Sequence, residues 1–113
     1  MIPDPTEFRL KVLWSLQRGL WDEVTPNLRG VAVSPTYPLI EATFIYEILG
    51  DEEREIVAEV ETLVYADFSP PVNAKFTAVM LPMSERRTLG PVEEWVYLRK
   101  EPTDWSPRSG PCI

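Results

Sequence analysis

The side chains best equipped for chemistry in this chain are carboxylates, and they are concentrated in one stretch. Between Glu41 and Asp67 there are nine acids and a single base, Arg54, which gives this stretch a formal charge of −8. The whole chain of 113 residues carries −7, so the rest is nearly neutral. Six of the nine acids fall on one predicted helix: Asp51, Glu52, Glu53, Glu55, Glu59 and Glu61.

The spacing of these acids leaves two interpretations open. Asp51, Glu55 and Glu59 recur at every fourth residue, so their like charges stack along one helix edge and repel each other. On one interpretation the acids form a solvated face of the helix, and the helix dipole favours Glu52 and Glu53 in the first turn. Glu59 lies two turns into the helix, where the dipole gives no such benefit. We therefore predict that Asp51, Glu52, Glu55 and Glu59 contact a positively charged partner.

Other kinds of carboxylate chemistry are disfavoured. Paired acids serve glycoside hydrolysis and divalent-metal sites, but these acids lie on a predicted exposed helix without pocket-forming glycines or aromatics around them. The chain has no histidine and one cysteine, Cys112, so the commonest general base and the commonest zinc ligands are missing. No phosphate-binding loop or nucleophile elbow is present. We expect no enzyme activity, no catalytic residues, no cofactor and no metal.

Charge and hydropathy also narrow the partners and the compartment. A net charge of −7 argues against a nucleic-acid ligand, because phosphates are held by clustered Lys and Arg. No apolar run approaches the roughly 20 residues of a membrane span, and the first residues do not resemble a signal peptide. A lone cysteine fits a reducing compartment. These features predict a cytoplasmic protein that binds another protein and no membrane.

Two amphipathic helices are predicted to position the acids and the core. The first runs from about Glu7 to Leu20 with Thr6 as its N-cap, and apolar residues recur along it every three to four positions. Trp14 falls on this stripe and is expected in the core. The second runs from its N-cap Asp51 to about Ala66, and the pattern of Ile56, Val57, Val60, Leu63 and Val64 gives the clearest stripe in the chain.

Four strands are predicted at 28–33, 39–49, 72–81 and 92–100, separated by segments rich in proline and polar residues. The order α-β-β-α-β-β with two hairpins favours an α+β fold in which a four-stranded antiparallel sheet carries both helices on one face. We expect one domain over residues 1–101 and a proline-rich C-terminal tail over 102–113, whose Trp105 either packs on the body or is exposed.

A few further residues have both a structural and a functional interpretation. The Ser84–Thr88 loop contains Arg86 and Arg87 and is expected to be an ordinary connector, with a second contact edge as the alternative. Trp21 and Trp95 are expected to pack at the boundary of the core, although aromatic residues of this kind also anchor interfaces.

Three blocks of sequence resemble a known family. They are Glu23-Val24-Thr25-Pro26-Asn27-Leu28-Arg29 followed by Val31, then Glu59-Val60-Glu61-Thr62 with Ala66-Asp67-Phe68, and Val96-Tyr97-Leu98-Arg99-Lys100-Glu101. In this order, over about residues 9–101, they resemble small immunity proteins of bacterial contact-dependent growth inhibition systems. The resemblance implies an inhibitor that binds a toxin domain, often a nuclease, in the cytoplasm of its own cell.

Together these features predict a non-enzymatic immunity protein that neutralises a basic toxin domain through its acidic surface. The acidic helix agrees with the resemblance, because nuclease domains carry positive charge to hold phosphates. The alternative is a small interaction or scaffold protein that forms a homodimer through an edge strand or an uncovered sheet face.

Overall fold

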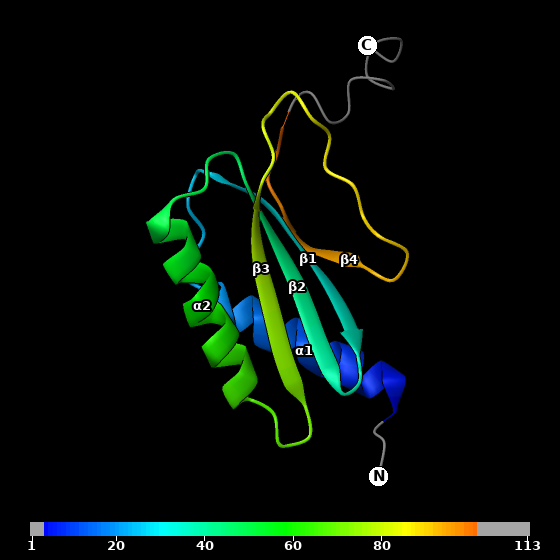
Figure 1. Ribbon diagram of the computed structural model, residues 1–113. Helices are drawn as coiled ribbons and strands as arrows, with labels where there is room; N and C mark the ends of the chain where they lie inside the picture. Colours follow the sequence, from blue (N-terminus) through cyan, green and yellow to red (C-terminus); the bar gives the residue numbers. More distant parts are fainter. Residues whose placement is uncertain (1–3, 102–113) are drawn as a thin grey trace.

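A computed structural model describes residues 4–101, which form two helices and a four-stranded sheet (Figure 1). The elements follow one another as α1 (Pro5–Gly19), β1 (Leu28–Thr36), β2 (Leu39–Tyr46), α2 (Asp51–Ala66), β3 (Asn73–Met80) and β4 (Glu94–Leu98). The predicted α+β class and the order α-β-β-α-β-β are confirmed. Neither described helix is long and apolar enough to cross a membrane.

The sheet is mixed, so the prediction of an antiparallel sheet with two hairpins was wrong in one respect. The strand order is β3-β2-β1-β4, in which β1 pairs antiparallel with β2 and β4, whereas β2 and β3 run parallel. Parallel neighbours need a crossover of a dozen or more residues. Helix α2 supplies that crossover, and it therefore returns the chain to lie beside β2 instead of pairing β3 with β4.

The N-caps of α1 and α2 lie two residues and one residue before the predicted caps, Thr6 and Asp51. Asp4 caps α1, because its carboxylate accepts a hydrogen bond of 2.8 Å from the Thr6 amide, and Pro5 occupies the first turn, where no amide hydrogen is needed. Gly50 takes the N-cap position of α2. Its amide donates to the Glu53 carboxylate at 2.8 Å, which explains why this acid is needed in the first turn.

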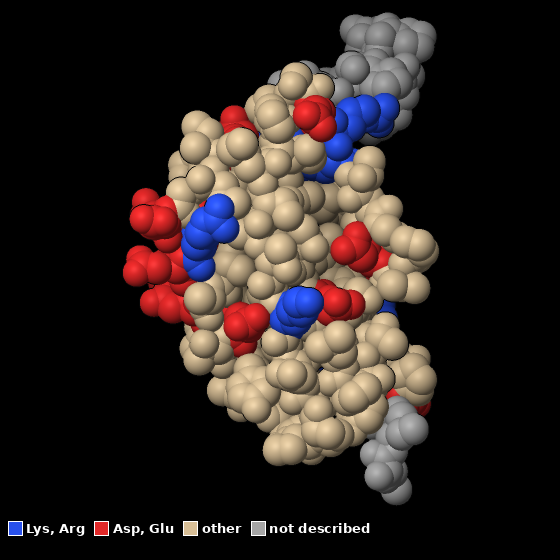
Figure 2. Space-filling view, in the orientation of Figure 1, with Lys and Arg blue, Asp and Glu red and all other residues tan. Residues whose placement is uncertain are grey.

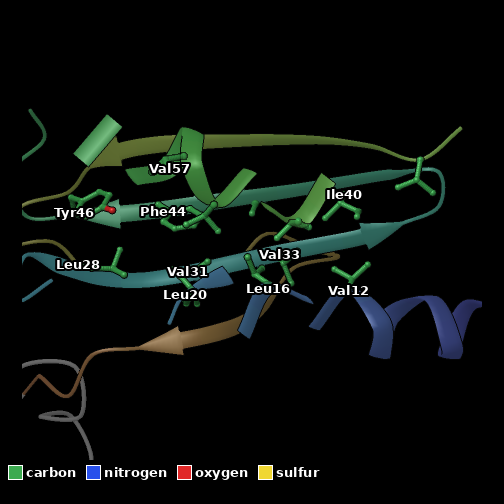
Figure 3. Close-up of a cluster of buried hydrophobic side chains, with 14 of the residues drawn as sticks. Val12, Leu16, Leu20, Leu28, Val31, Val33, Ile40, Phe44, Tyr46 and Val57 are labelled. Carbon is green, nitrogen blue, oxygen red and sulfur yellow. The ribbon is translucent and has the colours of Figure 1, made fainter. Parts of the chain in front are cut away.

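The core is one cluster between the helices and a single face of the sheet. Alternate residues of β2, from Ile40 to Tyr46, are buried there, while Glu41 faces the other side and is exposed. Figure 3 shows these side chains meeting those of β1 and both helices, which confirms the prediction that both helices pack on one face. The helices contribute Phe8, Val12, Leu16, Leu20, Val57, Val60 and Val64.

Gly19 has a packing role at the place where α1 meets α2. A Cβ atom at this position would lie 3.2 Å from Cγ1 of Val60 and 3.5 Å from Cγ2 of Val64. The absence of a side chain therefore lets the two helices approach closely. Next to this contact the Ser15 hydroxyl donates to the Asp67 carboxylate at 2.6 Å. The last turn of α1 is weakened by glycine, and helix packing compensates for it.

Side chains from the helices cap backbone groups on both edge strands of the sheet. The Phe76 amide on β3 donates to the Glu61 carboxylate of α2 at 2.8 Å. The Gln17 amide group of α1 donates to the Val96 carbonyl on β4 at 3.0 Å. Unpaired edge groups of this kind are the usual starting points for pairing with another chain. Both contacts therefore oppose edge-to-edge association.

Replacing Glu61 by alanine is expected to lower the free energy of unfolding by about 1 kcal/mol, the usual contribution of one such hydrogen bond. Urea unfolding followed by circular dichroism measures it. Glu55→Ala, on the same helix but exposed, is the matched control and should not lower the midpoint, because Glu55 makes no such hydrogen bond among the described residues. Equal midpoints for both variants would show that the Glu61 cap contributes nothing.

Candidate functional site

The four acids predicted to bind a partner lie together on the outer surface of α2. Asp51, Glu52, Glu55 and Glu59 are all exposed, and Figure 2 shows acidic side chains gathered over α2. This arrangement follows from the helical repeat, because Val57, Val60 and Val64 face the core and turn the acids away from it. We call these four residues the acidic face.

Other acids of the same stretch hold the fold together. Glu53 caps α2, and the pKa of its carboxyl is lowered mainly by the hydrogen bond from the Gly50 amide. Glu61 caps the edge of β3, and Glu47 and Asp67 form ion pairs with Arg99 and Arg18. Within residues 4–101 none of the four carboxylates of the acidic face forms an ion pair with Lys or Arg. The acids of this stretch therefore fall into two groups: those that form contacts within the fold, and the four of the acidic face, whose charge no described Lys or Arg neutralises in an ion pair.

A groove of about 780 Å³ runs along the acidic face. Its lining combines three acids of the acidic face with apolar and small residues of α2 and with one residue from the connector after α1: Glu23, Glu52, Glu55, Ile56, Ala58, Glu59, Thr62 and Leu63. Sequence reasoning missed Glu23 as part of this surface, because it belongs to a segment 36 residues before Glu59. The acidic groove is therefore built by α2 together with the connector after α1.

Glu23 and Glu59 form a pair of like-charged groups in this groove. Burial raises the pKa of the Glu23 carboxyl, and a hydrogen bond and repulsion from Glu59 raise it further. Glu23 also affects Tyr46, the last residue of β2. Burial and the charges of Glu53 and Glu23 raise the pKa of the Tyr46 hydroxyl to about 12. The groove is thus a place where added negative charge is unfavourable and positive charge is favoured.

Glu23→Gln is expected to raise the free energy of unfolding at neutral pH by roughly 0.2–0.5 kcal/mol, the usual cost of a like-charge neighbour. An acid whose pKa is raised by folding destabilises the folded state above that pKa, and the penalty disappears below its unfolded value of about 4.3. The gain should therefore be present at pH 7.5 and absent at pH 3.5. Urea unfolding at the two pH values measures it, and an equal gain at both would contradict the assignment.

The Ser84–Thr88 loop contributes a buried cation to a second charged cluster. Arg86 is exposed, but the Arg87 guanidinium turns inward and donates to the carbonyl oxygens of Arg29 and Arg99 at 2.6 and 2.8 Å. Burial lowers the pKa of Arg87. The loop is therefore more than a connector, because its arginine joins β1 to the end of β4.

A carboxylate stands at the centre of this cluster. Glu101 accepts two hydrogen bonds from Arg29, at 2.9 and 2.8 Å, and further ones from Arg99, and it lies 3.5 Å from the Arg87 guanidinium. Arg29 and Glu101 are 0% and 2% exposed. We call Arg29, Arg87, Arg99 and Glu101 the buried charge cluster. This cluster was not predicted from the sequence, because its members come together only in the fold.

The structure corrects the prediction for two of the tryptophans. Trp14 was expected in the core but is 62% exposed, because it lies beside the apolar stripe and not within it. Trp21, expected at the boundary of the core, is 67% exposed. Trp95 is half-buried and packs over Gly30, where a Cβ atom would approach its ring to 2.9 Å. The prediction of boundary packing is therefore confirmed for Trp95 alone, and Trp105 lies outside the described residues.

Among the described residues, no group of three or more acidic or sulfur-bearing side chains is arranged to hold a metal ion. The groove presents carboxylates around an apolar floor, which suits a protein surface bearing Lys and Arg.

Comparison with known proteins gives one match and one negative result. A family model described as MafI2 immunity protein matches residues 9–101, which include most of α1, all of α2, all four strands and the residues of both charged sites. No curated protein sequence matches the chain. The earlier resemblance to immunity proteins is confirmed at this level. The more specific assignment to contact-dependent growth inhibition stays a prediction.

Proposed function

Since the chain belongs to the MafI2 immunity protein family, we propose that it neutralises a toxin domain by covering a basic surface of that toxin with its acidic face. Membership of an immunity family supports a toxin-neutralising function and a toxin as the protein partner. The basic character of the toxin surface is our proposal. The observation that carries it is a set of four exposed carboxylates without an ion pair among the described residues.

The proposed mechanism is occlusion in two steps. The field of the acidic face first steers the toxin toward the inhibitor, which can raise association above the unsteered ~10⁵–10⁶ M⁻¹s⁻¹. The carboxylates then occupy the positions that substrate phosphates or other anions would take on the toxin. A nuclease is the toxin class that this chemistry fits best. Neutralisation of this kind needs no catalytic residue, cofactor or metal on the inhibitor.

The proposal includes a cytoplasmic location and a toxin delivered by contact between cells. The location follows from the resemblance stated above and from the lone cysteine, and delivery by contact follows from the resemblance alone. An inhibitor that protects its own cell has to meet the toxin where the toxin acts. An edge-strand homodimer is disfavoured, because Glu61 and Gln17 each cap one backbone group on a sheet edge.

Co-expression tests the proposed function. Each toxin domain encoded by the source genome is expressed in a sensitive host with and without this chain, and growth is recorded. We expect this chain to restore growth for one toxin and to form a stable complex with it. The toxin rescued in this way is called the cognate toxin below. If the chain rescues growth against none of these toxins, the proposed function is wrong.

A further inference from the structure

The outer face of α1 exposes an unusual amount of apolar surface. Leu10 and Trp14 are 54% and 62% exposed and lie one turn apart on α1, and Trp21, 67% exposed, lies two residues after the end of this helix. Single exposed apolar residues are normal on a protein surface, but a group that contains two exposed tryptophans is unusual. We call these three residues the indole face.

The fold does not need the indole face. The opposite side of α1 already supplies Phe8, Val12 and Leu16 to the core, each 4% exposed or less. Arg9 and Gln17 reach from the flank of the helix to Glu94 and Val96 on β4. The tryptophans are left outside these contacts. Exposed indoles carry a cost in solubility, which a binding role would justify.

The indole face and the acidic face belong to one surface. Helices α1 and α2 lie side by side, joined by the close approach of Gly19 to Val60 and by the bond from Ser15 to Asp67. Glu23, two residues after Trp21, lines the same groove as Glu55 and Glu59. The exposed surface of the helical layer therefore combines aromatic side chains with a row of carboxylates.

We propose that the indole face is the apolar anchor of the toxin interface, an inference that rests on the proposed function. Buried tryptophans commonly dominate binding energy, while charges at the rim direct association. The partner surface that fits is an apolar hollow bordered by Lys or Arg. A second copy of this chain fits less well, because symmetric pairing through this layer brings the same carboxylates together. The uncompensated charge thus selects a basic partner.

Binding kinetics with the cognate toxin test the inference. We expect Trp14→Ala and Trp21→Ala each to weaken binding about 30-fold or more, mainly through faster dissociation, because truncated hot spots release the partner sooner. Both positions are exposed, so the variants should keep the wild-type unfolding midpoint. Ile48→Ala and Val92→Ala are matched controls, since these residues are 70% and 66% exposed and lie outside α1 and α2.

The outcomes separate the two proposals. If the wild-type chain binds the cognate toxin and both tryptophan variants bind equally well, the indole face is not the anchor, while the proposed function stands. If no toxin is rescued or bound by the wild-type chain, the proposed function fails and the inference fails with it. Sedimentation of the free chain should show a monomer at both low and high salt. A dimer that the tryptophan substitutions abolish would assign this face to a second copy and overturn the inference.

Discussion

Replacing Arg29 by alanine is expected to cost about 3–5 kcal/mol of folding free energy, because the substitution leaves the buried Glu101 carboxylate without its main partner. Arg29 is 0% exposed and donates to Glu101 through two hydrogen bonds. A third donor group of Arg29 bonds the carbonyls of Leu81 and Pro82, each at 2.9 Å, so the start of the following loop should also loosen. Since small domains are stable by roughly 5–15 kcal/mol, this variant should be close to unfolding.

The exposed ion pair of Arg9 with Glu94 provides a matched control in the same protein. Arg9 binds Glu94 with similar two-bond geometry, at 2.7 and 2.8 Å, but its side chain is 46% exposed. Exposed ion pairs contribute little, because water and salt screen them. Arg9→Ala should therefore shift the urea midpoint by only a small fraction of the shift that Arg29→Ala causes. Similar shifts for the two variants would show that burial is not what makes the Arg29–Glu101 pair important.

The same cluster predicts how stability responds to acid. Burial alone would raise the pKa of the Glu101 carboxyl, but hydrogen bonds from Arg29 and Arg99 outweigh it and lower the pKa. A lowered pKa means that the stabilisation is present above the unfolded value of about 4.3 and is lost as the pH falls through the folded value. The cluster should therefore support the fold at neutral pH and lose its contribution as the pH falls below about 4.3.

Reversing the charge of Glu55 and Glu59 is expected to slow association with the cognate toxin roughly tenfold to a hundredfold at low salt. The double variant Glu55→Lys with Glu59→Lys replaces attraction by repulsion in the middle of the acidic face. The difference should shrink as salt is raised, because screening shortens the reach of exposed charges to about a Debye length. Stopped-flow association rates over a series of salt concentrations measure both effects.

The control for this experiment keeps the net charge the same. Glu41→Lys with Glu85→Lys changes two exposed acids outside α2, so it alters the overall charge equally. This control should retain most of the association rate and its salt dependence. If both double variants slow association equally, the effect comes from the net charge and not from the acidic face.

Helices and strands that are marked by a periodic pattern of apolar residues could be predicted from the sequence. The spacing of Val57, Val60 and Val64 predicted α2 and placed its acids outward, and alternation along β2 identified its buried face. The hairpin of β1 and β2 was also predicted, with Val33 now found opposite Ala42. Such patterns depend on the helical and strand repeats alone, so no knowledge of distant contacts was needed.

The features that depend on distant contacts were not predictable. The parallel pairing of β2 with β3 depends on where α2 returns the chain, and the role of Gly19 depends on the position of Val60. The prediction for Trp14 was wrong because this residue lies beside the apolar stripe, where spacing does not distinguish core from surface. Glu101 lies 72 residues after Arg29, so no local pattern links the two. Glu23 was missed as part of the groove for the same reason.

Carboxyl labelling of the chain, free and bound to the cognate toxin, tests the central claim most directly. A carbodiimide reagent modifies exposed carboxylates, and mass spectrometry reads the extent at each residue. If the acidic face binds the toxin, we expect its four acids to be labelled in the free chain and protected in the complex: Asp51, Glu52, Glu55 and Glu59. Glu41 and Glu85 should stay labelled in both. Equal labelling of the four acids in the free and bound chain would contradict this claim.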